Sequence, residues 1–99
     1  MRKLLKDNYQ AIVARGLITE NTTNRDFLRK VDEEIGETHK ALYLLEHEKE
    51  NNLAEEITDC INVLNNWLIN LGLDPDEELK KCLVKNLKRV KNENISENI

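Results

Sequence analysis

Apolar residues recur along this chain at intervals of three, four and seven positions, the spacing of an α-helix with one apolar side. One series begins after a Thr- and Asn-rich stretch at residues 18–24, and the clearest one ends at Gly72. The two series predict two long helices, each with one buried stripe. They consist of Phe27, Leu28, Val31, Ile35, Leu42 and Leu45, and of Leu53, Ile57, Ile61, Leu64, Leu68 and Leu71.

Polar residues at fixed offsets indicate where these two helices begin. Thr23 and Asp26 have the spacing of a capping box, in which each side chain pairs with the backbone of the other residue. Asn52 and Glu55 suggest a second box at the start of the later helix. The polar stretch 49–52 is short, so we expect the two helices to form an antiparallel hairpin.

Two further helices flank the hairpin. The first covers residues 4–15 and is followed by Gly16, which can adopt the left-handed conformation that closes many helices. The last begins at Pro75, because Asp74 is a good cap and proline is favoured at the first helical position. Its apolar stripe predicts an end at Lys91. We expect residues 92–99 to be a disordered tail, because they offer little to bury.

Composition supports an all-α fold. The chain has 99 residues, of which 39% are apolar and only 4% aromatic, with three Gly and one Pro. A domain of this size buries a modest fraction of its surface, so association with further copies would stabilise it. We therefore predict a single domain at residues 1–91, built as a small four-helix bundle that oligomerisation completes.

The charge excludes some classes of partner. A net charge of −4 gives no general attraction to nucleic acid or to an anionic membrane, although residues 80–91 are locally basic. No apolar stretch approaches transmembrane length, and no secretory signal is visible. Cys60 and Cys82 stand apart, typical of core cysteines in a reducing compartment. These features predict a soluble cytoplasmic protein without nucleic-acid or membrane partners.

Two acidic pairs are the strongest chemical signal. Glu34 and Glu37 lie one turn apart in one long helix, and Glu56 and Asp59 do so in the next. At about 100° per residue, each pair borders its apolar stripe. An antiparallel hairpin can therefore bring all four carboxylates to one half-buried seam.

Four clustered carboxylates need a counter-charge or protons. Two of them about 4 Å apart repel by roughly 4 kcal/mol at an effective dielectric constant near 20. The ligands are hard oxygens without His or Cys, which favours Mg²⁺, or Mn²⁺, over zinc. No Glu-x-x-His spacing supports a di-iron bundle. The alternative is that the acids form a solvated face of a non-enzymatic helical module that oligomerises or regulates.

The acidic motifs resemble those of a known family. Glu33-Glu34-Ile35-Gly36-Glu37, followed after 18 residues by Glu56-Ile57-Thr58-Asp59, is similar to the E-x-x-E and E-x-x-D pair of the MazG-like all-α nucleoside triphosphate pyrophosphohydrolases. The turn at residues 71–78 and the pair Lys85-Asn86 also resemble this family.

The resemblance implies a fold, a reaction and a metal site. The family is a helical bundle that forms dimers or tetramers, so a homodimer or homotetramer is implied here. Its members cleave a nucleoside triphosphate between the α and β phosphates, giving a monophosphate and pyrophosphate. By that resemblance, Mg²⁺ would be held against the triphosphate by Glu34, Glu37, Glu56 and Asp59.

Other residues have less specific candidate roles. Glu33 or Glu55 could accept the proton of the attacking water, and the sequence does not choose between them. Asn86 could contact the nucleotide, or its amide could pair with a neighbouring helix. Lys85 and Arg89 could meet phosphate oxygens or simply complement the helix dipole, and the resemblance favours Lys85.

Overall fold

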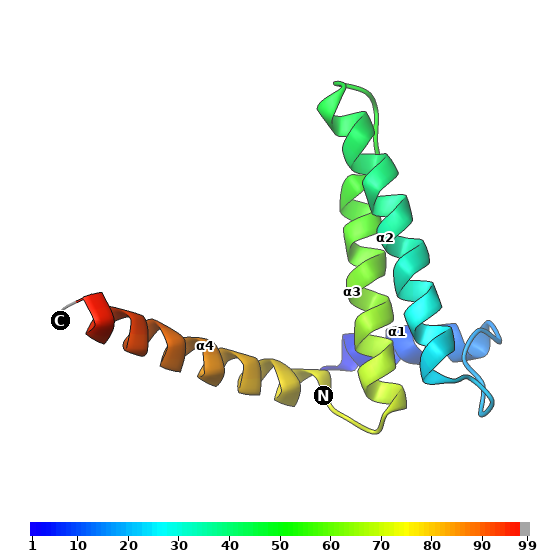
Figure 1. Cartoon of the computed structure of the whole chain (residues 1–99). Coiled ribbons are helices and arrows are strands. Elements are labelled where there is room, and N and C mark those ends of the chain that lie inside the picture. Colours follow the sequence, from blue (N-terminus) through cyan, green and yellow to red (C-terminus); the bar gives the residue numbers. More distant parts are fainter. Residues whose placement is uncertain (98–99) are drawn as a thin grey trace.

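The computed structural model of the chain describes residues 1–97, with side chains described as far as Glu93. It contains four helices: α1 (Lys3–Ala14), α2 (Asn24–Glu46), α3 (Leu53–Asn70) and α4 (Pro75–Glu97). No strand occurs in the described part of the chain, so the all-α prediction is confirmed. Figure 1 shows α2 and α3 side by side as an antiparallel hairpin, with α1 across its foot and α4 extending away from it.

Both long helices begin where the sequence predicts, but only α2 has the predicted capping box. The Asp26 N–H donates to Thr23 Oγ1 at 3.1 Å, and the Thr23 N–H donates to Asp26 Oδ2 at 2.9 Å, so the first capping box is confirmed. The second predicted box is wrong. Asn52 makes no side-chain cap bond and instead donates through Nδ2 to Glu56 Oε1 at 2.8 Å. Asn51 Oδ1 accepts from the first helical N–H at 3.1 Å in its place.

The predicted helix ends are right except for the last. Gly16 and Gly72 have φ values of 77° and 82°, in the left-handed region that a side chain disfavours. Helix α4 begins at Pro75, but it continues beyond Lys91 to Glu97, so the predicted end is too early. Residues 98 and 99 of the predicted disordered tail lie outside the described residues.

The packed part of the chain lies at the foot of the hairpin. Phe27 is buried and stacks on Trp67, with ring centroids 6.0 Å apart and planes 4° from parallel. Trp67 Nε1 also donates to Asn24 Oδ1 at 2.9 Å. Helix α1 is held to α3 by the Tyr9 hydroxyl, which lies 3.2 Å from Asn70 Oδ1. These contacts fix α1, α2 and α3 as one unit.

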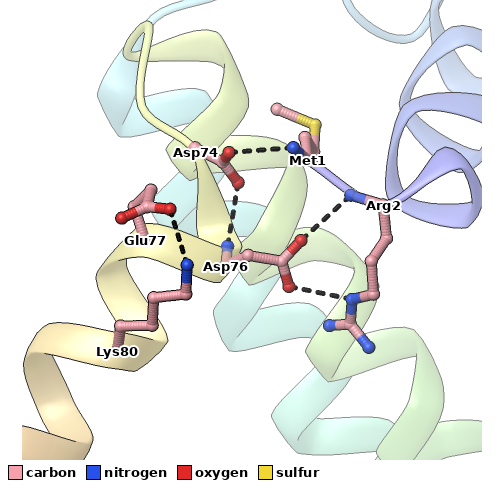
Figure 2. A network of polar contacts seen from close by, with 6 residues as sticks. All are labelled: Met1, Arg2, Asp74, Asp76, Glu77 and Lys80. Atoms are coloured by element: carbon pink, nitrogen blue, oxygen red, sulfur yellow. Dashed lines mark hydrogen bonds and ion pairs between the residues drawn. The ribbon is translucent and has the colours of Figure 1, made fainter.

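Ion pairs hold the corner between α3 and α4 (Figure 2). The amino group of Met1 lies 3.0 Å from Asp74 Oδ2, and the other Asp74 oxygen accepts from the Asp76 N–H at 3.0 Å. Arg2 donates to both oxygens of Asp76, through its backbone N–H at 2.9 Å and through Nε at 2.8 Å. The residues before α1 thus reach the first turn of α4.

The predicted apolar stripes of the hairpin are largely uncovered. Ile35 and Leu42 on α2, and Ile57 and Ile61 on α3, are each about half exposed. One helix can cover only one side of another. On α2, the covered side is displaced around the helix axis from the apolar stripe that the sequence predicted to be buried. Its least exposed positions recur at intervals of four and three, the spacing of a coiled-coil seam. These positions are Phe27, Val31, Glu34, Thr38 and Ala41, and the partly covered Leu44 follows three residues later.

Helix α4 is the least covered element. Its apolar side, called the α4 stripe here, has exposed fractions between 51% and 58% and consists of Leu79, Leu83, Leu87 and Val90. The chain exposes 7809 Å², whereas a compact protein of its mass would expose roughly 5,800 Å². Its radius of gyration is 17.4 Å, against about 13 Å for a compact domain of this length. A single chain therefore leaves much apolar surface in water.

None of the helices in the described residues combines the length and the apolar character needed to cross a lipid bilayer.

Candidate metal centre

Three carboxylates meet on the covered side of the hairpin. Glu34 comes from α2, while Glu56 and Asp59 lie one turn apart on α3. One oxygen of each lies within 4.8 Å of an oxygen of the other two, and all three side chains are partly buried. Glu34 also forms an ion pair with Lys30, and only 12% of its side chain is exposed. The seam thus concentrates negative charge away from bulk water.

The charge of this cluster is poorly compensated at Glu56. Partial burial raises the pKa of the Glu56 carboxyl, and the neighbouring charges of Asp59, Glu34 and Glu37 raise it further. The hydrogen bond from the Asn52 amide opposes this shift without cancelling it. The ionised form of Glu56 is therefore disfavoured until a cation binds nearby.

Lys30 supplies part of the compensation. Its ammonium group lies 3.2 Å from Glu34 Oε1 and 3.4 Å from Glu33 Oε2. Burial lowers the pKa of Lys30, but the hydrogen bonds and charges of Glu34 and Glu33 outweigh it, so the net pKa is raised. This lysine stays charged at one edge of the cluster and partly neutralises it.

The fourth predicted ligand, Glu37, and the two candidate bases, Glu33 and Glu55, lie outside the acidic cluster. Glu37 lies outside the cluster, with 48% of its side chain exposed and a contact to Lys40 at 3.5 Å. Glu33 is exposed but borders the cavity described below. Glu55 is exposed and does not border it. The structure therefore brings together three of the four predicted ligands and places only Glu33 of the two bases beside them.

The predicted substrate-binding residues of α4 are not near the cluster within one chain. Lys85, Asn86 and Arg89 are all exposed, and α4 packs only against α3 among the described helices. Figure 1 shows α4 pointing away from the hairpin. Asn86 Nδ2 lies 3.7 Å from the sulfur of Cys82, which is itself exposed. The expected core position of Cys82 is thus wrong for the isolated chain, and Asn86 contacts its own helix and not a neighbouring one.

A cavity of about 540 Å³ opens beside the acidic cluster, between α1, the α1–α2 loop and the hairpin. Glu34 and Asp59 form one part of its wall. The rest of the wall combines charged side chains with apolar side chains and two amides. The charged ones are Arg15, Asp26, Lys30 and Glu33, and the others include Ile12, Ile18, Phe27, Val63, Asn62 and Asn66. Sequence reasoning missed the contribution of α1 and of both amides.

One signal could have found the amides. Asn62 and Asn66 follow Asp59 at intervals of three and seven, and they therefore share its face of α3. The predicted apolar stripe lies on the opposite face of α3, so the prediction that Asp59 borders this stripe is wrong.

The donor set fits a hard divalent cation. Carboxylate oxygens from two helices converge, no sulfur or imidazole ligand is in the group, and the cavity leaves room for substrate oxygens or water. Comparisons with protein-family models, with curated proteins and with solved structures gave no match.

Proposed function

We propose that this protein is a Mg²⁺-dependent nucleoside triphosphate pyrophosphohydrolase, with Mn²⁺ as an alternative metal. It would cleave a ribo- or deoxyribonucleotide between the α and β phosphates and release a monophosphate and pyrophosphate. The observation that carries the proposal is the convergence of Glu34, Glu56 and Asp59, two of which, Glu34 and Asp59, line a cavity of about 540 Å³. The size lies within the usual range for small-molecule sites.

The proposed chemistry assigns roles to the residues around the cavity. The three carboxylates would hold Mg²⁺, which supplies charge neutralisation for the triphosphate and lowers the pKa of bound water when present. Glu33 is the proposed acceptor of the proton from that water, because it borders the cavity and Glu55 does not. The water oxygen bonds to the α-phosphorus, and the bridging oxygen leaves with pyrophosphate.

Glu37 is the weakest of the four proposed metal ligands. Its charge acts on Glu56, so it lies near the cluster, but its exposed side chain contacts Lys40 and is not one of the three converging groups. Replacement of Glu37 by Gln should therefore weaken metal binding less than replacement of Asp59 by Asn.

Assembly is part of the proposal. The chain exposes about 2,000 Å² more than a compact protein of its mass. Standard protein interfaces bury about 800 Å² per partner, so this excess is enough for a stable dimer or for the two interfaces of a tetramer. A second copy packed on the exposed stripes would also be the means by which Lys85, Asn86 and Arg89 reach a nucleotide.

The alternative is a non-enzymatic helical module that uses its stripes for oligomerisation. Exposed stripes support both proposals equally. The partly buried acids and the adjoining cavity favour the enzyme, because a solvated acidic face would have neither.

Pyrophosphate release tests the proposed function. The parent is incubated with Mg²⁺ and a panel of common ribo- and deoxyribonucleoside triphosphates, and the same panel is applied to the Asp59→Asn variant. Asp32→Asn is the matched control, because Asp32 is exposed on α2 and does not border the cavity. We expect Asp59→Asn to lose at least about 100-fold in rate. A parent that releases no pyrophosphate from any nucleotide contradicts the proposal.

A further inference from the structure

The amide of Asn66 is buried without a protein partner. Only 3% of this residue is exposed, and its Oδ1 accepts no hydrogen bond within the described part of the chain. Buried polar atoms are nearly always paired, because an unpaired one loses its bond to water and gains nothing. Such an atom destabilises the fold, so it calls for an explanation.

Neighbouring asparagines show that α3 can pair its amides when pairing serves the fold. Asn70, one turn further along, is 3.2 Å from the Tyr9 hydroxyl. Asn24 at the start of α2 accepts from Trp67 at 2.9 Å. Both of these amides hold helices together, whereas the Asn66 oxygen accepts no hydrogen bond from a neighbouring helix.

Asn66 lines the same cavity as the acidic cluster. Asp59 and Asn66 are two turns apart on one face of α3, which is about 10 Å along the helix axis. A nucleotide spans a similar length from its α-phosphate to the far edge of its base. The cavity wall also carries apolar side chains, among them Ile12, Ile18 and Val63, which suit the faces of a heterocycle.

We propose that Asn66 reads the base of the nucleotide, with its Oδ1 accepting a hydrogen bond from an N–H on the edge of the base. The inference rests on the proposed function, since it places the triphosphate at Glu34, Glu56 and Asp59. Asparagine offers an acceptor and a donor side by side, and therefore matches a base edge that presents an N–H next to an acceptor. A bound nucleotide would then supply the hydrogen-bond donor that Asn66 Oδ1 lacks in the fold.

Base discrimination tests this role. Initial rates of pyrophosphate release are measured with dATP, dCTP, dGTP, dTTP and dUTP, and with the matching ribonucleotides, for the parent and two variants. Asn66→Leu keeps the approximate size but removes both polar groups. Asn66→Asp keeps the acceptor and removes the donor. Asn65→Leu is the control, because Asn65 is the adjacent residue and does not border the cavity.

We expect Asn66→Leu to lower the rate with the preferred base by about 10- to 100-fold and to flatten the differences among bases. Asn66→Asp should shift the preference toward guanine, whose N1–H and N2–H form two adjacent donors for a carboxylate. The control should keep the parent's preference. Because Leu removes an unpaired buried oxygen, Asn66→Leu should melt at the parent's temperature or above it.

The results that overturn the inference are distinct from failure of the proposed function. Unchanged ratios of the rates among bases in Asn66→Leu overturn it, as does a change in ribose preference alone. An equal loss with every nucleotide and a lower melting temperature would identify a structural amide and also overturn it. A parent without activity on any nucleotide removes the proposed function itself, and this inference with it.

Discussion

The foot of the hairpin and helix α4 have similar sequence patterns but opposite surroundings. At the foot, Phe27 stacks on Trp67, and α1 closes over the hairpin, so side chains of α1, α2 and α3 enclose a cavity. On α4, the α4 stripe has the same helical spacing and remains more than half exposed. The difference shows that periodicity predicts a helix with an apolar side but does not say what covers that side.

The polarity of the two regions is also reversed. The covered seam between α2 and α3 holds carboxylates, the Thr38 hydroxyl and the Cys60 thiol. The hydroxyl oxygen of Thr38 and the sulfur of Cys60 lie 3.4 Å apart across the seam. The uncovered surfaces carry Leu, Ile and Val. A fold stable on its own would have the opposite arrangement. This arrangement is explained if the seam serves a ligand and the stripes serve assembly.

The largest expected effect on stability lies at the foot. Phe27→Ala should lower the free energy of unfolding by about 3–5 kcal/mol, because it removes a buried ring and leaves a cavity against Trp67. Leu4→Ala on exposed α1 is the control and should change it by less than about 0.5 kcal/mol. Urea unfolding monitored by circular dichroism measures both. Equal effects would show that the foot is not a packed core.

A charge in the α4 stripe should disrupt assembly. Leu83→Glu would place a carboxylate in the proposed interface and remove a buried side chain worth about 1.5–3 kcal/mol. The dissociation constant should rise at least about 100-fold, measured by sedimentation equilibrium. Lys88→Glu on the opposite side of α4 should leave assembly intact. A parent that is monomeric at high concentration would contradict the proposed interface.

Removal of one carboxylate should stabilise the metal-free protein and reduce the stability that it gains from metal. Without divalent cations, Glu56→Gln should melt above the parent, because Gln cannot ionise and the raised pKa of Glu56 shows that its charge is disfavoured in the fold. With millimolar Mg²⁺, the parent should gain stability, about 1.4 kcal/mol at ten times its dissociation constant, and the variant much less. Identical shifts in both proteins would place metal binding elsewhere.

The smallest effect concerns the corner between α3 and α4. The hydrogen bond from the Met1 amino group, more than any other contact, lowers the pKa of Asp74, so its stabilising effect is complete above about pH 4 and is lost as the pH falls below that value. Asp74→Asn should therefore melt below the parent near neutral pH. The difference should vanish in acid, as thermal melts across this range would show. A difference that persists at low pH would mean that the charge is not responsible.

The sequence predicted the local structure better than the packing. The Thr23 box, the left-handed Gly16 and Gly72, and Pro75 at the start of α4 depend on a few neighbouring residues, and they were predicted correctly. The covered side of α2 was predicted wrongly because Ile35 and Leu42 are exposed in the single chain, while Glu34 and Thr38 are partly covered. The false box at Asn52 has a similar cause, since a contact with Glu56 competes with capping.

The sequence also predicted only part of the candidate site, because spacing along a helix is a local signal and pairing with a neighbour is not. Glu34, Glu56 and Asp59 were found from spacing on two consecutive helices, which a short hairpin must bring together. Asn66 was missed, because the importance of an amide depends on whether a neighbour pairs with it. Lys85 lies on α4, which extends away from the hairpin in the single chain, so its proposed role depends on the proposed assembly.

Metal binding by the seam is the central claim, and calorimetric titration of Mg²⁺ into the parent and into Asp59→Asn tests it most directly. The account predicts binding to the parent and an affinity at least about tenfold weaker for the variant, because one of three converging carboxylates is lost. Equal affinities, or no binding to the parent even with nucleotide present, would contradict it.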